Sequence, residues 1–423
     1  MESNGTEGPS AVVRWLALSL LATLAASVLL ATEAYLEHLQ DRSSHDLLVD
    51  AARTLGVPFD ARDGLTVVRD LRARDSSAMF FFGVNGYARA LRAGGGGPLL
   101  PLTGPARATT VTCNEDGHWA SYMADRHGFN NPDSMWTVRP DLVLIGDSFA
   151  AGSCVDGGND VGADLRRLGR STLDLGNGGN GPLLDAAVFL EYGLPARPRY
   201  VIWEFFDNDV DDLVGELANP AIAAYLPPGR TQGLMSREAE RDSLVRAVYA
   251  RATARPEQLS PRPSVGKRLR MLFTLYAIRQ LVGQATLASR PQVDAQTAAT
   301  IRRIVSAARD SLAAHDGTLV VSYFPSWAHF KHDVRLSRDL RDSLAAISRG
   351  LGVPFLDVEG SLRSGGDFWT VFELRDAINT HYSVEGYRRV AVGMDAFLRS
   401  LPTKTSAANP PATVRRAAGA GGH

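Results

Sequence analysis

The stretch Asp141–Phe149, with the sequence DLVLIGDSF, determines the fold class of this chain. Residues 141–145 form a short apolar run that is typical of a buried strand, and Gly146, Asp147 and Ser148 follow where that strand ends. Similar apolar runs occur at residues 172–175, 200–206, 319–324 and 353–356. Helical patterns lie between them at 159–169, 182–192, 298–314 and 335–350, and a last helix is predicted at 384–400.

Strands that alternate with helices are joined by right-handed crossovers and form a parallel sheet with helices on both faces. The sequence therefore predicts an α/β fold for residues 140–401, with a doubly wound, flavodoxin-like and mainly parallel five-stranded sheet. A helical insertion at about residues 212–295, which contains the basic segment KRLRMLF, is expected to lie over the carboxyl edge of that sheet. Residues 34–139 form an accessory region, and the Ala/Pro/Gly-rich tail 402–423 is predicted to be disordered.

The N-terminal residues 1–33 contain a candidate membrane anchor. From Trp15 to Ala31 there are 17 residues without a charge, which is short for a membrane-spanning helix and long for the core of a signal peptide. Arg14 precedes this run and Glu33 follows it, which favours a cytoplasmic N-terminus and a catalytic domain outside the cytoplasm, periplasmic or at the cell surface. We predict an uncleaved signal anchor, with a cleaved signal peptide and a buried core helix as alternatives.

The composition excludes several classes of protein. Lys plus Arg number 45 and Asp plus Glu 46, so the net charge of -1 gives no general attraction to nucleic acid, and no nucleic-acid partner is expected. Two cysteines are too few for a disulfide framework or a multi-cysteine zinc module. The nine histidines contain no HExxH pattern. We therefore expect no metal and no cofactor.

Polar residues and glycines follow three of the predicted strands. Ser148 follows the first strand, the run GNGGNG at residues 176–181 follows the second, and Asn208 follows the third, while His381 precedes the last helix. The carboxyl ends of parallel strands meet at one edge of a sheet, where binding sites form. We therefore expect these residues to converge.

This set of residues fits acyl transfer. A serine hydroxyl needs an adjacent base to take its proton, so Ser148 is the predicted nucleophile and His381 the predicted base and then acid. The oxyanion needs fixed donors, for which we predict the backbone N–H groups of Ser148 and Gly179 and the side-chain amide of Asn208, with Gly178 as a rival to Gly179. Asp147 and Asp209 are expected to cap local N–H groups.

These blocks resemble those of a known family. GDSF, GNGGNG, the DND at 207–209 and His381 are similar, in order and spacing, to the four blocks of the SGNH/GDSL hydrolase superfamily over about residues 140–400. The upstream segments CNE at 113–115 and DRHGFNNP at 125–132 resemble membrane-anchored bacterial members. Such proteins are typically associated with exported polysaccharide, and related members are esterases or O-acetyltransferases. The resemblance implies an ester or carbohydrate substrate.

The third block departs from the family pattern. Phe206 and Asp207 stand where the family usually has a glycine just before or two before the asparagine. An acid beside the oxyanion donor would weaken anion stabilisation, unless its side chain faces away.

The last block departs as well. The family usually has an aspartate two or three residues before the histidine, where this chain has Asn379 and Ile378. The nearest acid is Asp376, and we predict that it orients the imidazole of His381 as the third catalytic residue. Asn379 and a backbone carbonyl are the alternatives, and a slower Ser–His dyad is expected if no carboxylate serves.

Cys113 and Cys154 are the only cysteines, and in an exported domain we expect them to form a disulfide that holds the upstream segment beside the nucleophile loop. Two separate buried thiols are the alternative. The sequence thus predicts an exported serine esterase or O-acyl(acetyl)transferase that acts on carbohydrate esters through an acyl-enzyme. The competing hypothesis is a catalytically inactive scaffold or polysaccharide-binding module. A flavodoxin-like nucleotide binder is disfavoured, because GDSFAAG is not a glycine-rich, cationic phosphate loop.

Overall fold

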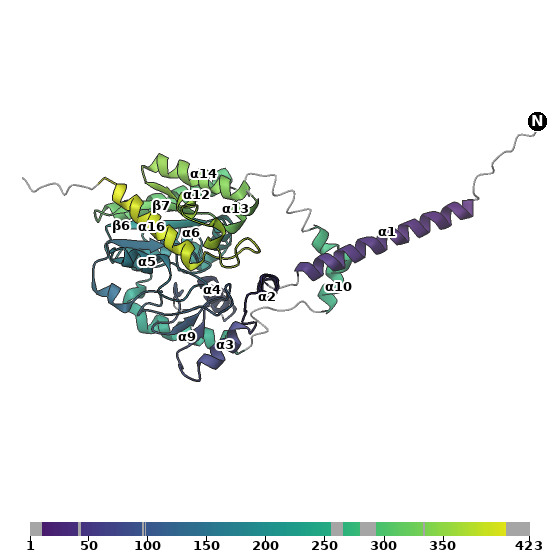
Figure 1. Ribbon diagram of the computed structural model, residues 1–423, viewed down its shortest axis with the longest axis horizontal. Helices are drawn as coiled ribbons and strands as arrows, with labels where there is room; N and C mark the ends of the chain where they lie inside the picture. Colours follow the sequence, from purple (N-terminus) through teal and green to yellow (C-terminus); the bar gives the residue numbers. More distant parts are fainter. Residues whose placement is uncertain are drawn as a thin grey trace, which may run out of the picture.

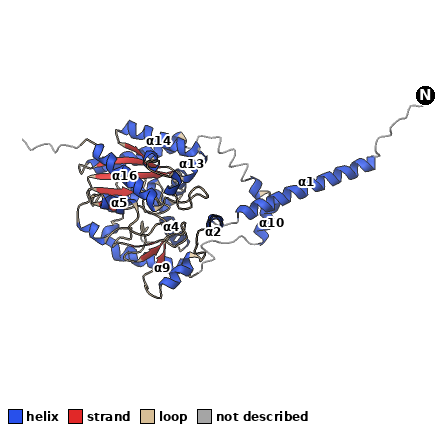
Figure 2. Ribbon diagram, viewed as in Figure 1, coloured by secondary structure: helices blue, strands red, loops and turns tan. Residues whose placement is uncertain are grey.

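The computed structural model describes residues 11–40, 44–94, 97, 99–254, 265–279, 293–332 and 335–402. Its central sheet has five strands in the order β5-β4-β6-β7-β8, and every neighbouring pair is parallel. The strands are β4 (Leu142–Ile145), β5 (Thr172–Asp174), β6 (Tyr200–Phe206), β7 (Thr318–Phe324) and β8 (Phe355–Asp357). Figure 2 shows these strands as one layer with helices around it. The predicted α/β fold and its five parallel strands are confirmed.

The sheet is covered on both faces because its strands are apolar on both sides. Alternate residues of β4 point to opposite faces, so Val143 and Ile145 belong to one buried cluster and Leu142 and Leu144 to the other. The first cluster includes helices α6 (Pro182–Val188), α12 (Ala295–Ala313) and α14 (Arg335–Leu351). The second includes α5 (Val161–Arg167) and α16 (Val384–Ser400), which pack against each other (Figure 1).

The accessory region has a small sheet of its own, which the sequence did not predict. Strand β2 pairs with β1 in parallel and with β3 in antiparallel fashion. The elements of this region are α2 (Ser44–Leu55), α3 (Gly64–Leu71), β1 (Met79–Phe80), α4 (Val84–Ala93), β2 (Thr109–Val111), β3 (Ser121–Met123) and η1 (Asp133–Thr137). The strands have two or three residues each, which is too short for a readable alternation of apolar and polar positions.

The remaining elements are short helices and turns around the sheet and in the insertion. They are η2 (Phe189–Gly193), α7 (Asp209–Leu217), α8 (Pro220–Ala223), η3 (Leu234–Arg237), α9 (Glu238–Thr253), α10 (Val265–Phe273), α13 (Trp327–His332), α15 (Glu359–Leu362) and η5 (Phe368–Val371).

The insertion does not lie where it was expected. Helix α9 packs on α4 of the accessory region, and α10 packs on the N-terminal helix, so neither covers the carboxyl edge of the sheet. One physical reason for the position of α9 is Arg241, whose side chain is fully buried. Its guanidinium donates to the carbonyl oxygens of Gly104 at 2.9 Å and His127 at 3.0 Å, both in the accessory region. A buried cation needs such acceptors, and they fix the helix there.

Helix α1 (Ala11–Gln40) projects from the rest of the molecule (Figure 1). Its segment Ala11–Leu36 is long and apolar enough to cross a membrane, and none of its most apolar window is buried. The alternative of a buried core helix therefore does not describe α1. The predicted tail beyond residue 402 lies outside the described residues.

Candidate active site

The loops after β4, β5 and β6 meet at the carboxyl edge of the sheet, because these strands are direct neighbours. The turn after β4 requires a glycine. Gly146 has a φ of +153°, and a Cβ there would lie 2.2 Å from Oε2 of Glu204. The same Glu204 oxygen accepts the backbone N–H of Asp147 at 2.9 Å. The buried Glu204 thus holds the backbone of the turn that presents Ser148.

A serine, a histidine and a carboxylate form a continuous hydrogen-bonded chain at this edge. Nε2 of His381 lies 2.9 Å from Oγ of Ser148. Nδ1 of His381 lies 3.0 Å from Oε1 of Glu115, and the backbone N–H of His381 donates to the other Glu115 oxygen at 2.6 Å. The side chains of His381 and Glu115 are 23% and 13% exposed, so water is largely, but not wholly, excluded from the ion pair. This is the arrangement that a serine nucleophile, its base and an orienting acid require.

The environment of His381 favours the charged form of its imidazole. Burial disfavours protonation, but the carboxylate of Glu115, through its charge and hydrogen bond, and the charge of Asp147 outweigh burial and raise the pKa of His381. The ring also packs on Phe149, with ring centroids 4.7 Å apart. Glu115 and Phe149 therefore hold the ring from its edge and its face.

Glu115, not Asp376, is the carboxylate beside His381. Asp376 is exposed and forms an ion pair with Nζ of Lys331 at 2.9 Å, which lowers the pKa of its carboxyl group. Asn379 is also exposed. The prediction of Asp376 as the orienting residue assumed that the acid is local in sequence to the histidine. Instead the acid comes from the accessory region, 266 residues earlier in the chain.

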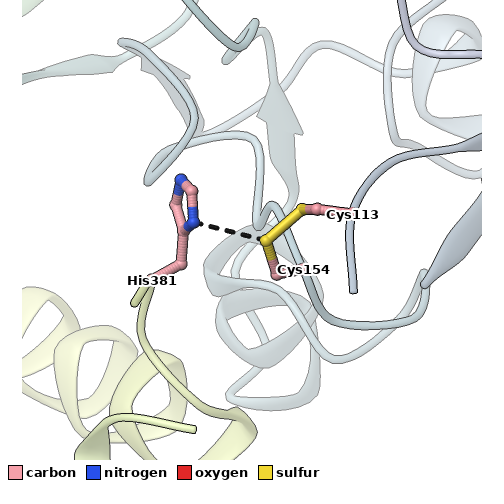
Figure 3. Close-up of side chains that lie close together, drawn as sticks. All are labelled: Cys113, Cys154 and His381. Atoms are coloured by element: carbon pink, nitrogen blue, oxygen red, sulfur yellow. Dashed lines mark hydrogen bonds between the residues drawn. A yellow bond between two sulfur atoms is a disulfide. The ribbon is translucent and has the colours of Figure 1, made fainter. Parts of the chain in front are cut away.

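A disulfide holds Glu115 in place. Cys113 and Cys154 are bonded, with their Cα atoms 4.9 Å apart, so the expected pairing is present in the structure. Sγ of Cys154 lies 3.3 Å from Nδ1 of His381, and Figure 3 marks this contact with a dashed line. The disulfide thus joins the segment that carries Glu115 to the loop that follows Ser148. The side chains of Cys113, Cys154 and His381 lie close enough to share a metal ion, but the sulfurs of a disulfide are not the thiolates that bind metals.

Two further contacts fix the turn that contains Glu115. Asn114 donates from its side chain to the carbonyl of Asp60 at 2.9 Å and accepts the N–H of Gly117 at 2.9 Å. His118 contacts both Asp116, at 2.7 Å, and Asp156, at 3.2 Å. Since Asp156 lies in the loop after the nucleophile, the turn is tied to that loop a second time.

The predicted oxyanion donors lie around Ser148. Within the described part of the chain, no acceptor is found for the backbone N–H groups of Ser148, Gly178 or Gly179. A Cβ on Gly178 would lie 3.6 Å from Cβ of Ser148. Gly179 is exposed and has a φ of +76°, and its carbonyl accepts the side-chain amide of Asn85 at 2.9 Å. The glycine loop therefore offers two backbone donors, and both Gly178 and Gly179 stay candidates.

Asn208 stands at the N-terminus of α7 at the end of β6. Its side chain makes no capping hydrogen bond to the helix, and the residue is exposed. An asparagine in this position usually caps the first turn. A free amide next to the nucleophile strand is what an oxyanion donor requires.

The acids near Asn208 and Ser148 accept hydrogen bonds from neighbouring groups. Asp207 accepts hydrogen bonds from the hydroxyls of Tyr323 in β7 at 2.7 Å and Ser337 in α14 at 2.6 Å, so both of its oxygens are engaged. Asp209 accepts the N–H of Phe206 at 2.9 Å, and Asp147 accepts that of Phe149 at 2.8 Å. The aspartate that stands here in place of the family's usual glycine therefore adds no unpaired carboxylate to the site. Asp209 and Asp147 cap local backbone N–H groups, as expected.

Comparisons with known proteins find neither a matching family model nor a curated relative. Among solved structures, this chain is similar to a G-D-S-L family protein from Desulfitobacterium hafniense, at 12% identity over 60% of this chain and 97% of that one, with a TM-score of 0.35. It is also similar to a lipolytic G-D-S-L protein from Veillonella parvula, at 12% identity, 62% and 98% coverage and a TM-score of 0.33. A third is the acetylxylan esterase Axe2 from Geobacillus stearothermophilus, at 14% identity, 62% and 94% coverage and a TM-score of 0.33.

The case for the fold rests on the strand order and on where the blocks lie. The serine, glycine and asparagine blocks follow β4, β5 and β6, and the histidine block precedes α16, as the resemblance to the SGNH/GDSL hydrolases implies. The one residue of the chain Ser148–His381–Glu115 that the sequence did not identify is Glu115. A signal for it was present, because Glu115 is two residues from Cys113 and the predicted disulfide already placed Cys113 beside the nucleophile loop.

Proposed function

We propose that this chain is a serine esterase or O-acyltransferase in which Ser148, His381 and Glu115 form the catalytic triad. The observation that carries the proposal is the hydrogen-bonded chain from Oγ of Ser148 through both ring nitrogens of His381 to Glu115, with distances of 2.9 and 3.0 Å. These groups come from three separate parts of the sequence. Their convergence at the carboxyl edge of the sheet, where sites form in open parallel sheets, supports catalysis over a purely structural role.

The first half of the reaction forms an acyl-enzyme. Oγ of Ser148 attacks the ester carbonyl, while Nε2 of His381 takes the hydroxyl proton. The tetrahedral intermediate collapses, the bond to the leaving alcohol breaks, and His381 returns the proton to the leaving oxygen. The acyl group stays on Ser148 as an ester.

Glu115 determines which ring nitrogen of His381 carries the proton. Its carboxylate can only accept, so it keeps a proton on Nδ1 and leaves Nε2 free to receive the proton from Ser148. When His381 becomes an imidazolium, the carboxylate stabilises the charge. The second hydrogen bond, from the backbone N–H of His381, prevents the carboxylate from rotating away.

The negative charge on the substrate oxygen needs donors that are in place before the reaction. We assign the backbone N–H groups of Ser148 and Gly179 and the side-chain amide of Asn208 to this role, with Gly178 as the alternative to Gly179. The evidence is that these groups lack acceptors of their own within the described residues and follow three adjacent strands. Donors fixed in this way lower the barrier without reorganisation during the reaction.

The second half of the reaction decides between hydrolysis and transfer. Water or a sugar hydroxyl gives its proton to Nε2 of His381 and attacks the acyl group on Ser148. The bond from the acyl carbon to Oγ of Ser148 then breaks, His381 returns the proton to Oγ, and an acid or a new ester is released. Both outcomes use the same residues. Carbohydrate esters are the proposed substrates, on the basis of the resemblance to membrane-anchored proteins associated with exported polysaccharide.

The accessory region bounds the space for the acyl group. The half-buried ring of Phe81 lies against Gly178, so that a Cβ on this glycine would lie 3.1 Å from the ring and 3.6 Å from Cβ of Ser148. An aromatic ring so close to the nucleophile leaves little room beside it. We infer a preference for small acyl groups such as acetyl.

The site is proposed to work outside the cytoplasm, with α1 as an uncleaved anchor. The disulfide supports this location, because disulfides persist in oxidising compartments. The apolar and fully exposed face of α1 supports the anchor.

The test is covalent labelling of the full-length protein with a fluorophosphonate probe. We expect the wild type to be labelled and the Ser148→Ala variant not to be. A correctly folded wild type that does not react, with an intact disulfide, would instead support a catalytically inactive scaffold.

A further inference from the structure

Helix α10 presents an apolar stripe to solvent. Val265, Leu269 and Phe273 are 76%, 50% and 70% exposed, and they recur every four residues, which places them on one side of the helix. Apolar side chains of this size rarely form an exposed stripe on a short helix unless it contacts a partner or a membrane.

Basic residues lie beside and opposite this stripe. Lys267, Arg268 and Arg270 are all exposed, and no acidic residue occurs in the helix. An apolar stripe with basic residues on the remaining surface is the pattern of helices that lie in the interface of a membrane with anionic lipids.

Helix α10 is attached to α1 rather than to the globular part. The two helices pack together, and Figure 1 shows α10 beside the end of α1 that is nearer the sheet domain. Glu33 of α1 is fully buried, and it accepts the backbone N–H groups of Ala277 at 2.6 Å and Ile278 at 2.9 Å, which lie in the short helical segment that follows α10.

The position of Glu33 sets the depth of α10 relative to a bilayer. The uncharged run of α1 ends at Ala31. A hydrocarbon core is about 30 Å thick and takes about 20 helical residues, so a span that begins near Trp15 reaches the headgroup region close to Glu33. The contact with α10 therefore lies at the membrane surface.

We propose that α10 lies in the membrane–water interface next to α1, with its apolar stripe among the acyl chains and its basic side chains among anionic phospholipid headgroups. The exposed apolar surface of α1 and the stripe of α10 are then covered by the same bilayer. The helix then attaches the insertion between β6 and β7 to the membrane surface. This proposal goes beyond the enzymatic one and rests on α1 as a membrane span.

The experiment is spin-label accessibility in the full-length chain. Both native cysteines form the disulfide, so a single added cysteine can be labelled. The labelled variants are Leu269→Cys on the stripe, Lys267→Cys on the opposite side, Leu24→Cys in α1 and Val214→Cys on the exposed surface of α7. The protein is placed at one copy per nanodisc in phosphatidylcholine with phosphatidylglycerol. Collisions with oxygen report lipid, and collisions with a water-soluble nickel chelate report water.

We expect the labels at Leu24 and Leu269 to favour oxygen several-fold over the chelate, and those at Lys267 and Val214 to favour the chelate. We also expect that removing phosphatidylglycerol, or combining Lys267→Gln, Arg268→Gln and Arg270→Gln, shifts the Leu269 label toward the chelate.

Three results would overturn the proposal. If the Leu269 label is as accessible to the chelate as the Val214 label while Leu24 is embedded, α1 anchors the chain but α10 is in water. If Leu24 is in water too, the anchor itself is wrong. If the Leu269 label is shielded from both reagents, protein rather than lipid covers the stripe. The same conclusion holds if the label becomes shielded only in discs that contain two copies of the chain. None of these outcomes depends on the activity of Ser148.

Discussion

Replacement of Glu115 by glutamine tests the least expected feature of the site. The amide is close in shape to the carboxylate, so the two contacts to His381 can both be kept. Its oxygen can still accept the backbone N–H of His381, but its NH₂ group then faces Nδ1 and donates to it. The proton of the neutral imidazole must move to Nε2, which can no longer accept the proton of Ser148.

The expected loss follows from this change of tautomer. In serine hydrolases with the same three roles, replacing the acid by its amide lowers kcat by about 10⁴. The Glu115 pair is partly exposed, so we expect a loss of about 10²–10⁴ in kcat, which is about 3–5.5 kcal/mol in the barrier.

The pH profile gives a second readout. The base must be neutral to act, so activity falls as pH drops through the pKa of His381, and the raised pKa places this limb above the usual value of 6.5. Without the charge of Glu115, burial lowers the pKa, and the limb should move to lower pH in the residual activity of Glu115→Gln.

The assay is hydrolysis of p-nitrophenyl acetate between pH 5 and 9, with thermal unfolding to confirm the fold. Asp376→Asn is the matched control, because Asp376 pairs with Lys331 on the surface and should change kcat less than about twofold. The reasoning is refuted if Glu115→Gln keeps full activity, or if Asp376→Asn reproduces its loss.

Three other predictions concern the disulfide, the oxyanion donor and the acyl pocket. The double variant Cys113→Ser/Cys154→Ser opens a link across 41 residues, so we expect about 4 kcal/mol less stability in denaturant unfolding and a lower kcat, and unchanged kcat would show that the disulfide does not position Glu115. Asn208→Ala should lower kcat by ~10²-fold or more, with the melting temperature preserved because Asn208 makes no capping bond; unaltered kcat would remove it from the oxyanion hole. Phe81→Ala should raise kcat/KM for butyrate relative to acetate esters by about tenfold or more, and an unchanged ratio would mean that the ring does not bound the acyl site.

The sequence predicted the central fold well because that fold depends on local patterns. The run at residues 142–145 is apolar on both faces, and β6 and β7 are largely so, which means that the burial of these central strands between two helix layers could be anticipated. The positions of Ser148, Asn208 and His381 then followed from the rule that strand ends meet at one edge.

The acid of the proposed triad could not be found by the same reasoning. Glu115 is brought to His381 by a disulfide and by hydrogen bonds of Asn114 and His118 to distant loops, and local sequence does not encode such contacts. The family pattern favoured an acid close to His381 and so favoured Asp376. The clue that pointed elsewhere was the pair Cys113 and Glu115, read together with the partner cysteine.

The position of the insertion was missed for a similar reason. The sequence shows that residues 238–253 can form a helix, but not that the buried Arg241 takes its acceptors from the accessory region. Tyr249 and Asp242 of the same helix also accept backbone N–H groups of the accessory region, and nothing in the spacing of apolar residues indicates where such partners are.

The most direct test of the central claim is to identify the residue that carries the acyl group. The full-length protein is mixed with p-nitrophenyl acetate, quenched in acid within the first turnover and digested, and the peptides are analysed by mass spectrometry. The account predicts one acetyl group on Ser148 in the wild type. When Glu115 or His381 is replaced, this group should form far more slowly. Hydrolysis of the ester with no acetyl group on Ser148, or with the group on another residue, would contradict it.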